Sequence, residues 1–438
     1  MADKRDNALR KILGNMGVVT VCNIIALVGM MWRTFLLAST FDLENFGRVI
    51  ICLNFFAVVK MLAKPGLGFT LQKYIPEYDH QGASDRAASL CWLCAYLSIL
   101  VAIPIMLGGV VAIPWIAEHW YDDCSIIFPM QVMAFTSAFF LLGDIASMLL
   151  RLVDAFIWAL LPMTLAAVAV PLYLVSIDGS SFTVSKVVVA IAASEFFILL
   201  ALLCALLIKT KKYWKFSRKT LSLAPLRGQG KEIKSILTHT SVFGILRGGS
   251  ESVAAFLIGV FAGAKDIAVI GMGIQLAKPI TFIQASVGSV IGPEISTLYA
   301  KGRYGKVMQL LNKTIIVGGL ALVGGLLFSY LIGPWLITRY LGEAYLQAMP
   351  VFYMLATSYM LIVMFTGFLP ISIARGEIKR RNLVVSIRFL YLGVAVAIGL
   401  NAWNAAFVQL LGALTIRVFN DWPLYRSLNN EMHPRLKS

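Results

Sequence analysis

Predominantly apolar runs of 18 or more residues recur along the whole 438-residue chain. Each run is long enough to cross the hydrocarbon core of a bilayer, which is about 30 Å thick. Backbone amides in lipid must find their partners within the protein, and runs of this length do so as α-helices, because barrel strands are far shorter. Only 14% of the residues are charged and 59% are hydrophobic, unlike a soluble domain. The sequence therefore predicts an all-α polytopic membrane protein.

The apolar runs and the proline, glycine and charged residues between them predict twelve transmembrane helices. The first run follows a basic N-terminus without a small-residue cleavage site, so we interpret it as an uncleaved span. The predicted spans lie near residues 13–38, 47–71, 87–113, 125–149, 153–176, 185–208, 236–262, 268–292, 313–337, 349–373, 383–401 and 404–422.

The distribution of basic residues predicts the orientation of the spans. The first, third and fifth connections contain no lysine or arginine, whereas the even-numbered connections carry between one, Arg151 in the fourth, and several, as in Arg375–Arg381 of the tenth. Cytoplasmic loops collect such residues, so we place the even-numbered connections and both termini in the cytoplasm. The longest polar stretch, Lys209–Lys234, has nine basic residues and one acid. Its position between two sets of six spans favours a solvated cytoplasmic hinge over a nucleic-acid site.

The two halves of the chain resemble each other. Asp42 and Gly47 at the opening of the second span recur as Asp266 and Gly271 at the opening of the eighth. Six spans per half is an even number, so both halves insert the same way round. This predicts two six-helix bundles related by a parallel pseudo-two-fold repeat around a central cleft. The predicted domains are a bundle at 1–208, a basic connector at 209–235 and a bundle at 236–438.

Basic residues inside predicted spans are candidates for contact with an anionic substrate. Charge at membrane depth is costly, and a guanidinium suits a phosphate especially well. Lys278 precedes Pro279, where a helix bend would free backbone carbonyls for its amine, and Arg247 stands four residues before Glu251, with which it could simply pair. The candidates for a cationic cleft are Arg33, Lys60, Arg247 and Lys278.

Three acids also lie within the predicted spans. A buried carboxylate can carry H⁺, bind a coupling cation such as Na⁺, or pair with a basic residue on another helix. The sequence leaves these readings open for Asp144, Glu195 and Glu251. Lys64, Arg388 and Arg417 stand near predicted inner ends, where snorkelling to the interface is the simpler interpretation.

Motifs for enzymatic or metal chemistry are missing from the sequence. Cys91 and Cys94 form a C-x-x-C within a predicted span, but no second pair or histidine cluster accompanies them. The four histidines lack ligand spacing, and no P-loop, dinucleotide fingerprint or nucleophile elbow occurs. We therefore expect no metal site, no cofactor beyond a coupling ion and no enzymatic activity.

Three stretches carry a resemblance to a known family: FDLENFGRVI, GLGFTLQKYIPEYDHQGASDRAASL and SVGSVIGPEISTLYAKGRYGKVMQLL. They resemble the polysaccharide-flippase branch, Wzx-type, of the MOP superfamily of lipid-linked oligosaccharide exporters. The resemblance implies a flippase in the cell inner membrane that moves an undecaprenyl-pyrophosphate-linked oligosaccharide to the outer leaflet by alternating access. The unit would be that of an O-antigen or exopolysaccharide. The implied partners are this polyprenyl-linked glycan, membrane lipids and glycan polymerase machinery, with no nucleic acid. Lipid II flippases of the superfamily usually carry two further spans, which argues against a peptidoglycan role.

Two other functions compete with this reading. A cation-coupled multidrug exporter of the same superfamily would favour an acid-rich cleft, whereas the candidates here include several bases. A membrane enzyme of glycan assembly would favour a large external loop with catalytic residues, whereas the predicted outer loops are short. The sequence leaves the identity of the sugar, the coupling ion and the oligomeric state open.

Overall fold

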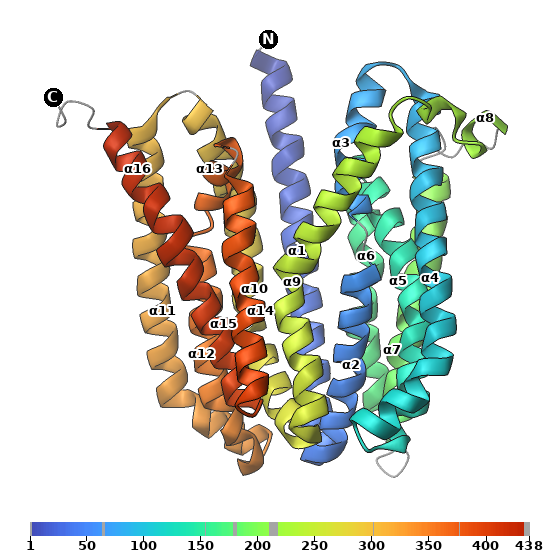
Figure 1. The fold of residues 1–438 in the computed structure, drawn as a ribbon, viewed down its shortest axis with the longest axis vertical. Helices are drawn as coiled ribbons and strands as arrows, with labels where there is room; N and C mark the ends of the chain where they lie inside the picture. The colour runs from blue at the N-terminus through green and yellow to red at the C-terminus, as the bar shows by residue number, and fades with distance from the viewer. Residues whose placement is uncertain are drawn as a thin grey trace. The chain divides into compact units, whose positions relative to one another are not determined.

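The structure is a computed structural model that describes residues 2–63, 66–153, 155–177, 182–209, 218–300, 302–375 and 377–432. Every regular element in these ranges is a helix (Figure 1). Eight of the described helices are long and apolar enough to cross a membrane, judged by length and composition. Each of the twelve predicted spans overlaps at least one helix. The predicted all-α membrane fold is confirmed.

The chain divides into two compact units. Unit 1 comprises Met1–Leu36 and Ile51–Gly249, and unit 2 comprises Leu37–Ile50 and Ser250–Ser438. The chain passes between the units within three helices, which are α1 (Ala2–Thr40), α2 (Leu43–Ala63) and α9 (Gly230–Phe261). The bounds of these units differ from those of the predicted domains, which are 1–208, 209–235 and 236–438. The division into two bundles and a connector stays a prediction.

Helix α5 is the centre of unit 1 and packs against α4, α6 and α7. Its buried positions hold many small residues, such as Ala134, Ser137 and Gly143, which let neighbouring helices approach closely. At Gly109, α4 comes so close to α5 that a methyl group on this glycine would lie 2.6 Å from the side chain of Ala134. The remaining helices of unit 1 are α3 (Leu67–His80), α4 (Ser84–Trp120), η1 (Cys124–Ile126), α5 (Ile127–Leu152), α6 (Phe156–Val175), α7 (Val184–Lys209), α8 (Arg218–Leu221) and η3 (Ala224–Leu226).

The second predicted span, 47–71, is two helices rather than one. Helix α2 ends at Ala63, and α3 begins at Leu67 after Gly66, which has a positive φ of 54°. The sequence places Pro65 here, and a proline disfavours the helical conformation in the residue before it. Glycine accepts the left-handed conformation without a steric penalty. The tenth predicted span is divided in the same way, into α12 (Ala348–Met364) and α13 (Phe368–Ala374).

The described part of the basic connector is packed onto unit 1. Leu226 and Ile233 are buried in one apolar core with residues of α3 and α4. The hydroxyl of Tyr78 on α3 donates a hydrogen bond to the side-chain carbonyl of Gln229. These apolar residues anchor the stretch to unit 1, whereas its charged residues, such as Lys219, Arg227 and Lys231, are exposed. A hinge role for the stretch stays a prediction. Residues 210–217 lie outside the described residues.

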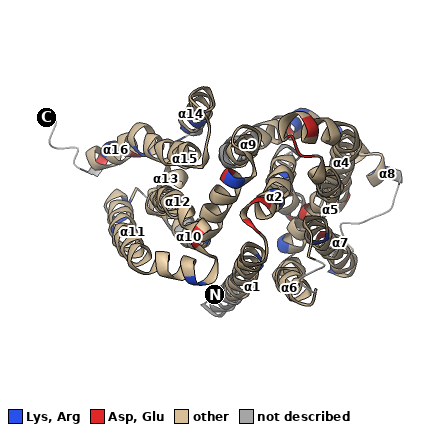
Figure 2. Cartoon of the chain, turned by 90° about the horizontal axis from the view of Figure 1, so that it is seen from below, with Lys and Arg blue, Asp and Glu red and all other residues tan. Residues whose placement is uncertain are grey.

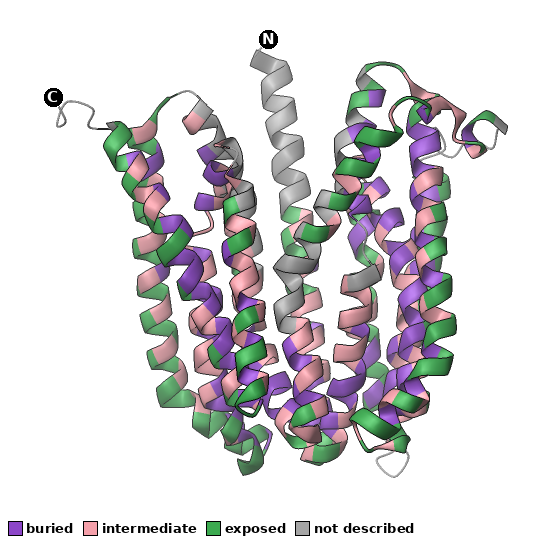
Figure 3. Ribbon diagram, viewed as in Figure 1, coloured by how far each residue is buried: buried purple, intermediate pink, exposed green. Residues whose placement is uncertain are grey.

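Helix α12 occupies the same central place in unit 2, where it packs against α10, α11 and α15. Along α11 exposed residues continue for most of its length (Figure 3). They include Leu320 and Val323, which are 71% and 67% exposed. Apolar exposure on this scale fits a face turned to lipid. The other helices of unit 2 are α10 (Gly263–Ala300), α11 (Tyr304–Tyr340), η4 (Glu343–Gln347), α14 (Ile378–Ala397), α15 (Ala402–Ile416), η5 (Arg417–Asp421) and α16 (Trp422–Met432).

The residues that repeat between the halves have visible structural roles, all within unit 2. Asp42 accepts a hydrogen bond from the backbone N–H of Asn45 at 3.3 Å, next to the start of α2. Asp266 accepts one from the backbone N–H of Ala402 at 3.4 Å. Gly47 and Gly271 both lie where another segment approaches the helix backbone. The repeat signal thus marks packing of the second unit.

Replacing Gly47 with alanine is expected to destabilise the protein by about 1–3 kcal/mol, the usual cost of overpacking. The added methyl group would lie 2.0 Å from the carbonyl oxygen of Ala264, a backbone atom that cannot rotate away. Thermal unfolding in detergent measures the effect. Gly393→Ala is the control in the same unit, because no atom lies within 4 Å of its new methyl group. Equal stability of the two variants would contradict this packing.

Candidate functional site

Three of the predicted charged residues of unit 1 lie near enough to one another for an electrostatic influence. Arg33 lies on α1, Lys60 on α2 and Glu195 on α7. The carboxylate of Glu195 interacts electrostatically with both basic side chains. Most of the helical ribbon is uncharged (Figure 2), so charged residues on these three helices stand out from their surroundings. We call Arg33, Glu195 and Lys60 the charged ladder.

The amine of Lys60 is held between two aromatic rings. It lies 4.1 Å from the ring centre of Phe56 and 4.4 Å from that of Phe140. The two rings meet edge to face, with centres 6.3 Å apart. A cation over an aromatic face gains about 0.5–2 kcal/mol, with the larger values where water is excluded. The rings therefore fix the position of the ammonium without neutralising its charge.

Arg33 has unused hydrogen-bonding capacity. Its side chain is half-buried, and its Nε atom is buried without a hydrogen-bond partner among the described residues. An unmade hydrogen bond from a buried donor is costly, about 1–3 kcal/mol and more for a charged group. An anionic ligand would supply the acceptor. The two cations of the ladder are the groups that would attract such a ligand.

The three side chains of the ladder lie at different depths along the membrane normal. Arg33 stands seven residues before the end of α1, and Lys60 stands seventeen residues after the start of α2. The two helices are joined by a short turn and run in opposite directions, so at about 1.5 Å per residue the two cations differ by roughly 15 Å in depth. Glu195 is eleven residues into α7 and interacts with both. The acid therefore lies between the two cations along the membrane normal.

The other predicted site residues are not assigned to the ladder. Asp144 is one turn beyond Phe140 on the same face of α5. Lys278 belongs to α10 of unit 2, and its backbone carbonyl accepts a hydrogen bond from the Thr281 hydroxyl at 2.7 Å. The side chains of Arg247 and Glu251, like residue Lys64, lie outside the described residues. Their predicted roles stay predictions.

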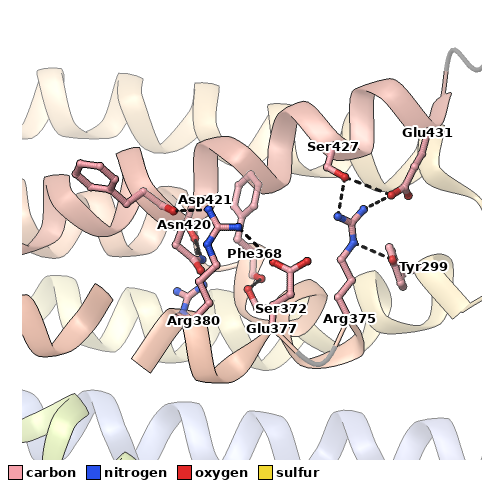
Figure 4. Close-up of polar contacts among 12 residues, drawn as sticks. Tyr299, Phe368, Ser372, Arg375, Glu377, Arg380, Asn420, Asp421, Ser427 and Glu431 are labelled. Carbon is pink, nitrogen blue, oxygen red and sulfur yellow. Dashed lines mark hydrogen bonds and ion pairs between the residues drawn. The ribbon is translucent and has the colours of Figure 1, made fainter. Parts of the chain in front are cut away.

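A second charged group lies in unit 2, in and around the π-helical turn η5 (Figure 4). The fully buried carboxylate of Asp421 binds the guanidinium groups of Arg381, at 3.1 Å, and Arg417. It also accepts a hydrogen bond from Asn420 at 2.8 Å. Arg417 lies over the ring of Phe365, with the guanidinium carbon 5.1 Å from the ring centre. The interpretation of Arg417 as a snorkelling residue is therefore wrong.

Arg388 is also enclosed by the protein rather than directed to an interface. Only 8% of the residue is exposed, and its side chain crosses the backbone of α15 at Gly412. A methyl group at Gly412 would lie 2.3 Å from Cγ of Arg388. The snorkelling interpretation is wrong here too, because α15 offers a glycine over which the side chain can lie flat.

Arg375 joins three helices of unit 2 (Figure 4). Its guanidinium donates hydrogen bonds to the hydroxyls of Tyr299 at 2.9 Å and Ser427 at 2.8 Å, and it also pairs with Glu431. These contacts fasten α16 to α10 and α13. Arg375 and Asp421 each link separate elements of unit 2, so we assign both to its architecture, and the ladder remains the candidate for ligand contact.

Sequence reasoning identified the three charges of the ladder but missed its aromatic residues. Phe56 stands four residues before Lys60 on α2, a spacing that places both on one helix face and was visible in the sequence. Phe140 comes from α5, eighty residues further on, and no local pattern connects it with Lys60. For Asp421, the partner Arg381 is forty residues distant, so only the fold reveals the pair.

No family model and no curated protein matches the sequence. Solved structures do match over nearly the whole chain. An inward-facing multidrug resistance MATE family transporter of the MOP superfamily has a TM-score of 0.70 at 15% identity, covering 92% of this chain and 96% of that one. The lipid II flippase MurJ in an inward closed conformation has a TM-score of 0.69 at 11% identity, with coverage of 94% and 90%.

A MOP superfamily transporter from Pyrococcus furiosus has a TM-score of 0.61 at 17% identity, covering 95% of this chain and 96% of that one. At such identities the likeness shows the fold alone. The structures that the chain resembles are transporters and flippases. The chain is therefore a multi-pass membrane protein whose fold is similar to that of these solved structures.

Proposed function

We propose that the protein is a flippase for an undecaprenyl-pyrophosphate-linked oligosaccharide, of the O-antigen or exopolysaccharide kind. The ladder would bind the pyrophosphate while the lipid passes from the inner to the outer leaflet of the cytoplasmic membrane. The observation that carries the proposal is the convergence of Arg33 and Lys60 on Glu195 inside a transporter fold. A pyrophosphate needs cationic hydrogen-bond donors at membrane depth, and the ladder provides them.

The spacing of the ladder suits stepwise passage. If both termini are cytoplasmic, as the basic connections predict, Lys60 is the inner cation and Arg33 the outer one. The pyrophosphate would meet Lys60 first and Arg33 afterwards, so neither site has to bind it across the whole bilayer. Glu195 lies between the two cations and repels the anion, which limits how long the pyrophosphate stays at Lys60 or at Arg33. The glycan would travel beside it in water, and the polyprenyl tail would stay in lipid.

Multidrug export is the second candidate function, and two observations favour it. The structural relatives include MATE transporters, and Glu195 places a carboxylate at membrane depth. Such an exporter would use Glu195 for a cationic drug or for the coupling ion, H⁺ or Na⁺. Pocket polarity is linked to function within this fold, since reverse polarity of its binding pocket suggests a different function for the Pyrococcus furiosus transporter. The two cations of the ladder favour an anionic substrate over a cationic drug.

Reconstituted protein decides between the two functions. Proteoliposomes that contain undecaprenyl-pyrophosphate-linked oligosaccharide should expose the glycan to an external glycosidase faster than protein-free liposomes do. Parallel vesicles with an imposed H⁺ or Na⁺ gradient should show no accumulation of a cationic dye. Dye transport without glycan exposure would reject the flippase proposal and support drug export.

The predicted pair Arg247 and Lys278 has a separate test. Neutralising both, as Arg247→Gln with Lys278→Gln, is expected to abolish glycan export while the amount of protein in the membrane stays unchanged. The physical reason is that each removes a cation from the middle of a predicted span, where an anion has few other partners. Surface polysaccharide and immunoblotting are the measurements. Normal surface polysaccharide would contradict a role of these two cations in the substrate path.

A further inference from the structure

An apolar groove of about 500 Å³ lies on unit 1 between α4, α5 and α7. Phenylalanine rings dominate its lining, with small residues such as Ala193 on the α7 side. The most prominent rings are those of Phe128, Phe135, Phe139 and Phe196. The groove is distinct from the ladder in position and chemistry, and the proposed function does not use it.

The few polar groups of the lining are occupied within the protein. The side-chain amide of Gln131 donates a hydrogen bond to the carbonyl of Val110 at 3.2 Å. The hydroxyl of Thr136 donates one to the carbonyl of Val132 at 2.6 Å. An occupant therefore finds apolar walls, and no charged side chain lines the groove. This excludes a phosphate or sugar and selects a hydrocarbon.

Aromatic contacts close the floor of the groove. The ring of Phe139 lies 5.4 Å from that of Phe135 and 5.2 Å from that of Phe196, measured between centres. The neighbouring residues Phe140 and Glu195 project about 100° away from Phe139 and Phe196 around their helices, and they serve the ladder, because Phe140 contacts Lys60 and Glu195 belongs to it. The groove and the ladder therefore share no lining residue.

The groove is open to the surroundings, and its extent along α5 gives its length. Phe128, Phe135 and Val110 are 55%, 50% and 61% exposed, on helices that meet the criteria for membrane spans. Its lining begins at Phe128, next to the start of α5, and reaches Phe139. Eleven residues at about 1.5 Å each give a length of roughly 16 Å, close to one leaflet of a hydrocarbon core about 30 Å thick.

We propose that this groove binds one acyl chain of a membrane phospholipid, in the leaflet that contains the α4–α5 connection. The length matches a chain that ends near the bilayer midplane, whereas a polyprenyl tail is much longer than one leaflet. The bound chain packs against the rings that brace α5 on α7, and so supports the helices that carry Phe140 and Glu195.

Native mass spectrometry of the full-length protein released from phospholipid nanodiscs tests the proposal. The wild-type protein should retain a phospholipid under conditions that strip loosely bound lipid. Ala193→Trp should retain one phospholipid fewer, because the indole fills the groove. The matched control is Ala169→Trp, which adds the same side chain at an exposed position of α6 outside the groove, and it should retain as many as the wild type.

A photocrosslinking amino acid, p-benzoylphenylalanine, in place of Phe135 provides a test that does not depend on the tryptophan variant. In nanodiscs of dioleoyl phosphatidylglycerol with added undecaprenyl phosphate, the adduct should carry the mass of the phospholipid. Retention of the same lipid number by Ala193→Trp would overturn the proposal. An undecaprenyl adduct would overturn the assignment to an acyl chain, and a peptide adduct would show that protein covers the groove.

Discussion

Lys60→Met is expected to lower the rate of glycan flipping about 10- to 100-fold while the protein remains folded. A charge-assisted hydrogen bond contributes about 1.5–3 kcal/mol, and each 1.4 kcal/mol is a factor of ten. Methionine keeps the length of the side chain, and its sulfur packs well against the rings of Phe56 and Phe140. The loss should therefore come from the missing charge. The glycosidase-access assay in proteoliposomes measures it.

Two further variants separate charge from position. Lys60→Arg keeps the positive charge between the rings and should flip within a few-fold of the wild-type rate. Lys186→Met removes a lysine from the exposed start of α7 in the same unit and should have no effect. A wild-type rate for Lys60→Met would remove Lys60 from the substrate path.

Asp421→Ala is expected to destabilise unit 2 by about 3–5 kcal/mol, the usual cost of removing one partner of a buried ion pair. Asp421 is fully buried, and its loss leaves the guanidiniums of Arg381 and Arg417 close together without their shared carboxylate. The free energy of unfolding in a mild detergent is the measurement, with yield of folded protein as a second reading.

The matched control is Glu44→Ala, which breaks the ion pair between Glu44 and Arg48, of 2.9 Å, near the surface of the same unit. The Glu44 side chain is 50% exposed, so its loss should cost only about 0–1 kcal/mol. Similar losses for the two alanine variants would show that Asp421 is not the centre of a buried network.

The membrane fold could be predicted because lipid imposes strong rules on sequence. Backbone satisfaction forces helices, and the length of each apolar run then gives the span, so all twelve predicted spans overlap helices. The division of a predicted span into two helices was harder to predict, although Pro65 next to Gly66 is a sequence signal for the division of the second span. The packing of Leu226 against α3 and α4 could not be predicted, because basic residues dominate the composition around it.

The members of the charged ladder could be predicted from the sequence, but their proximity could not. Charge at membrane depth singled out Arg33, Lys60 and Glu195 individually. Their convergence depends on helices that are far apart in the sequence, and one sequence contains no signal for that proximity. The error at Arg417 has a different and local cause, because its position near a predicted inner end was used as the guide. Its carboxylate partner four residues on, Asp421, lies on the same face and was overlooked in favour of solvent.

The π-helical turn η5 gives unit 2 a place where the number of residues can vary without moving the helix that follows. Such a turn contains one residue more than the α-helix it interrupts and winds it into nearly the same rotation. Deletion of Val418 that restored ordinary α-helical winding would therefore leave α16 facing the same way, with Ser427 and Glu431 still next to Arg375. The change would be confined to the turn itself, where the chain from Arg417 to Asp421 would be one residue shorter. A one-residue gap here in a related chain would thus be compatible with the same anchoring of the C-terminal helix.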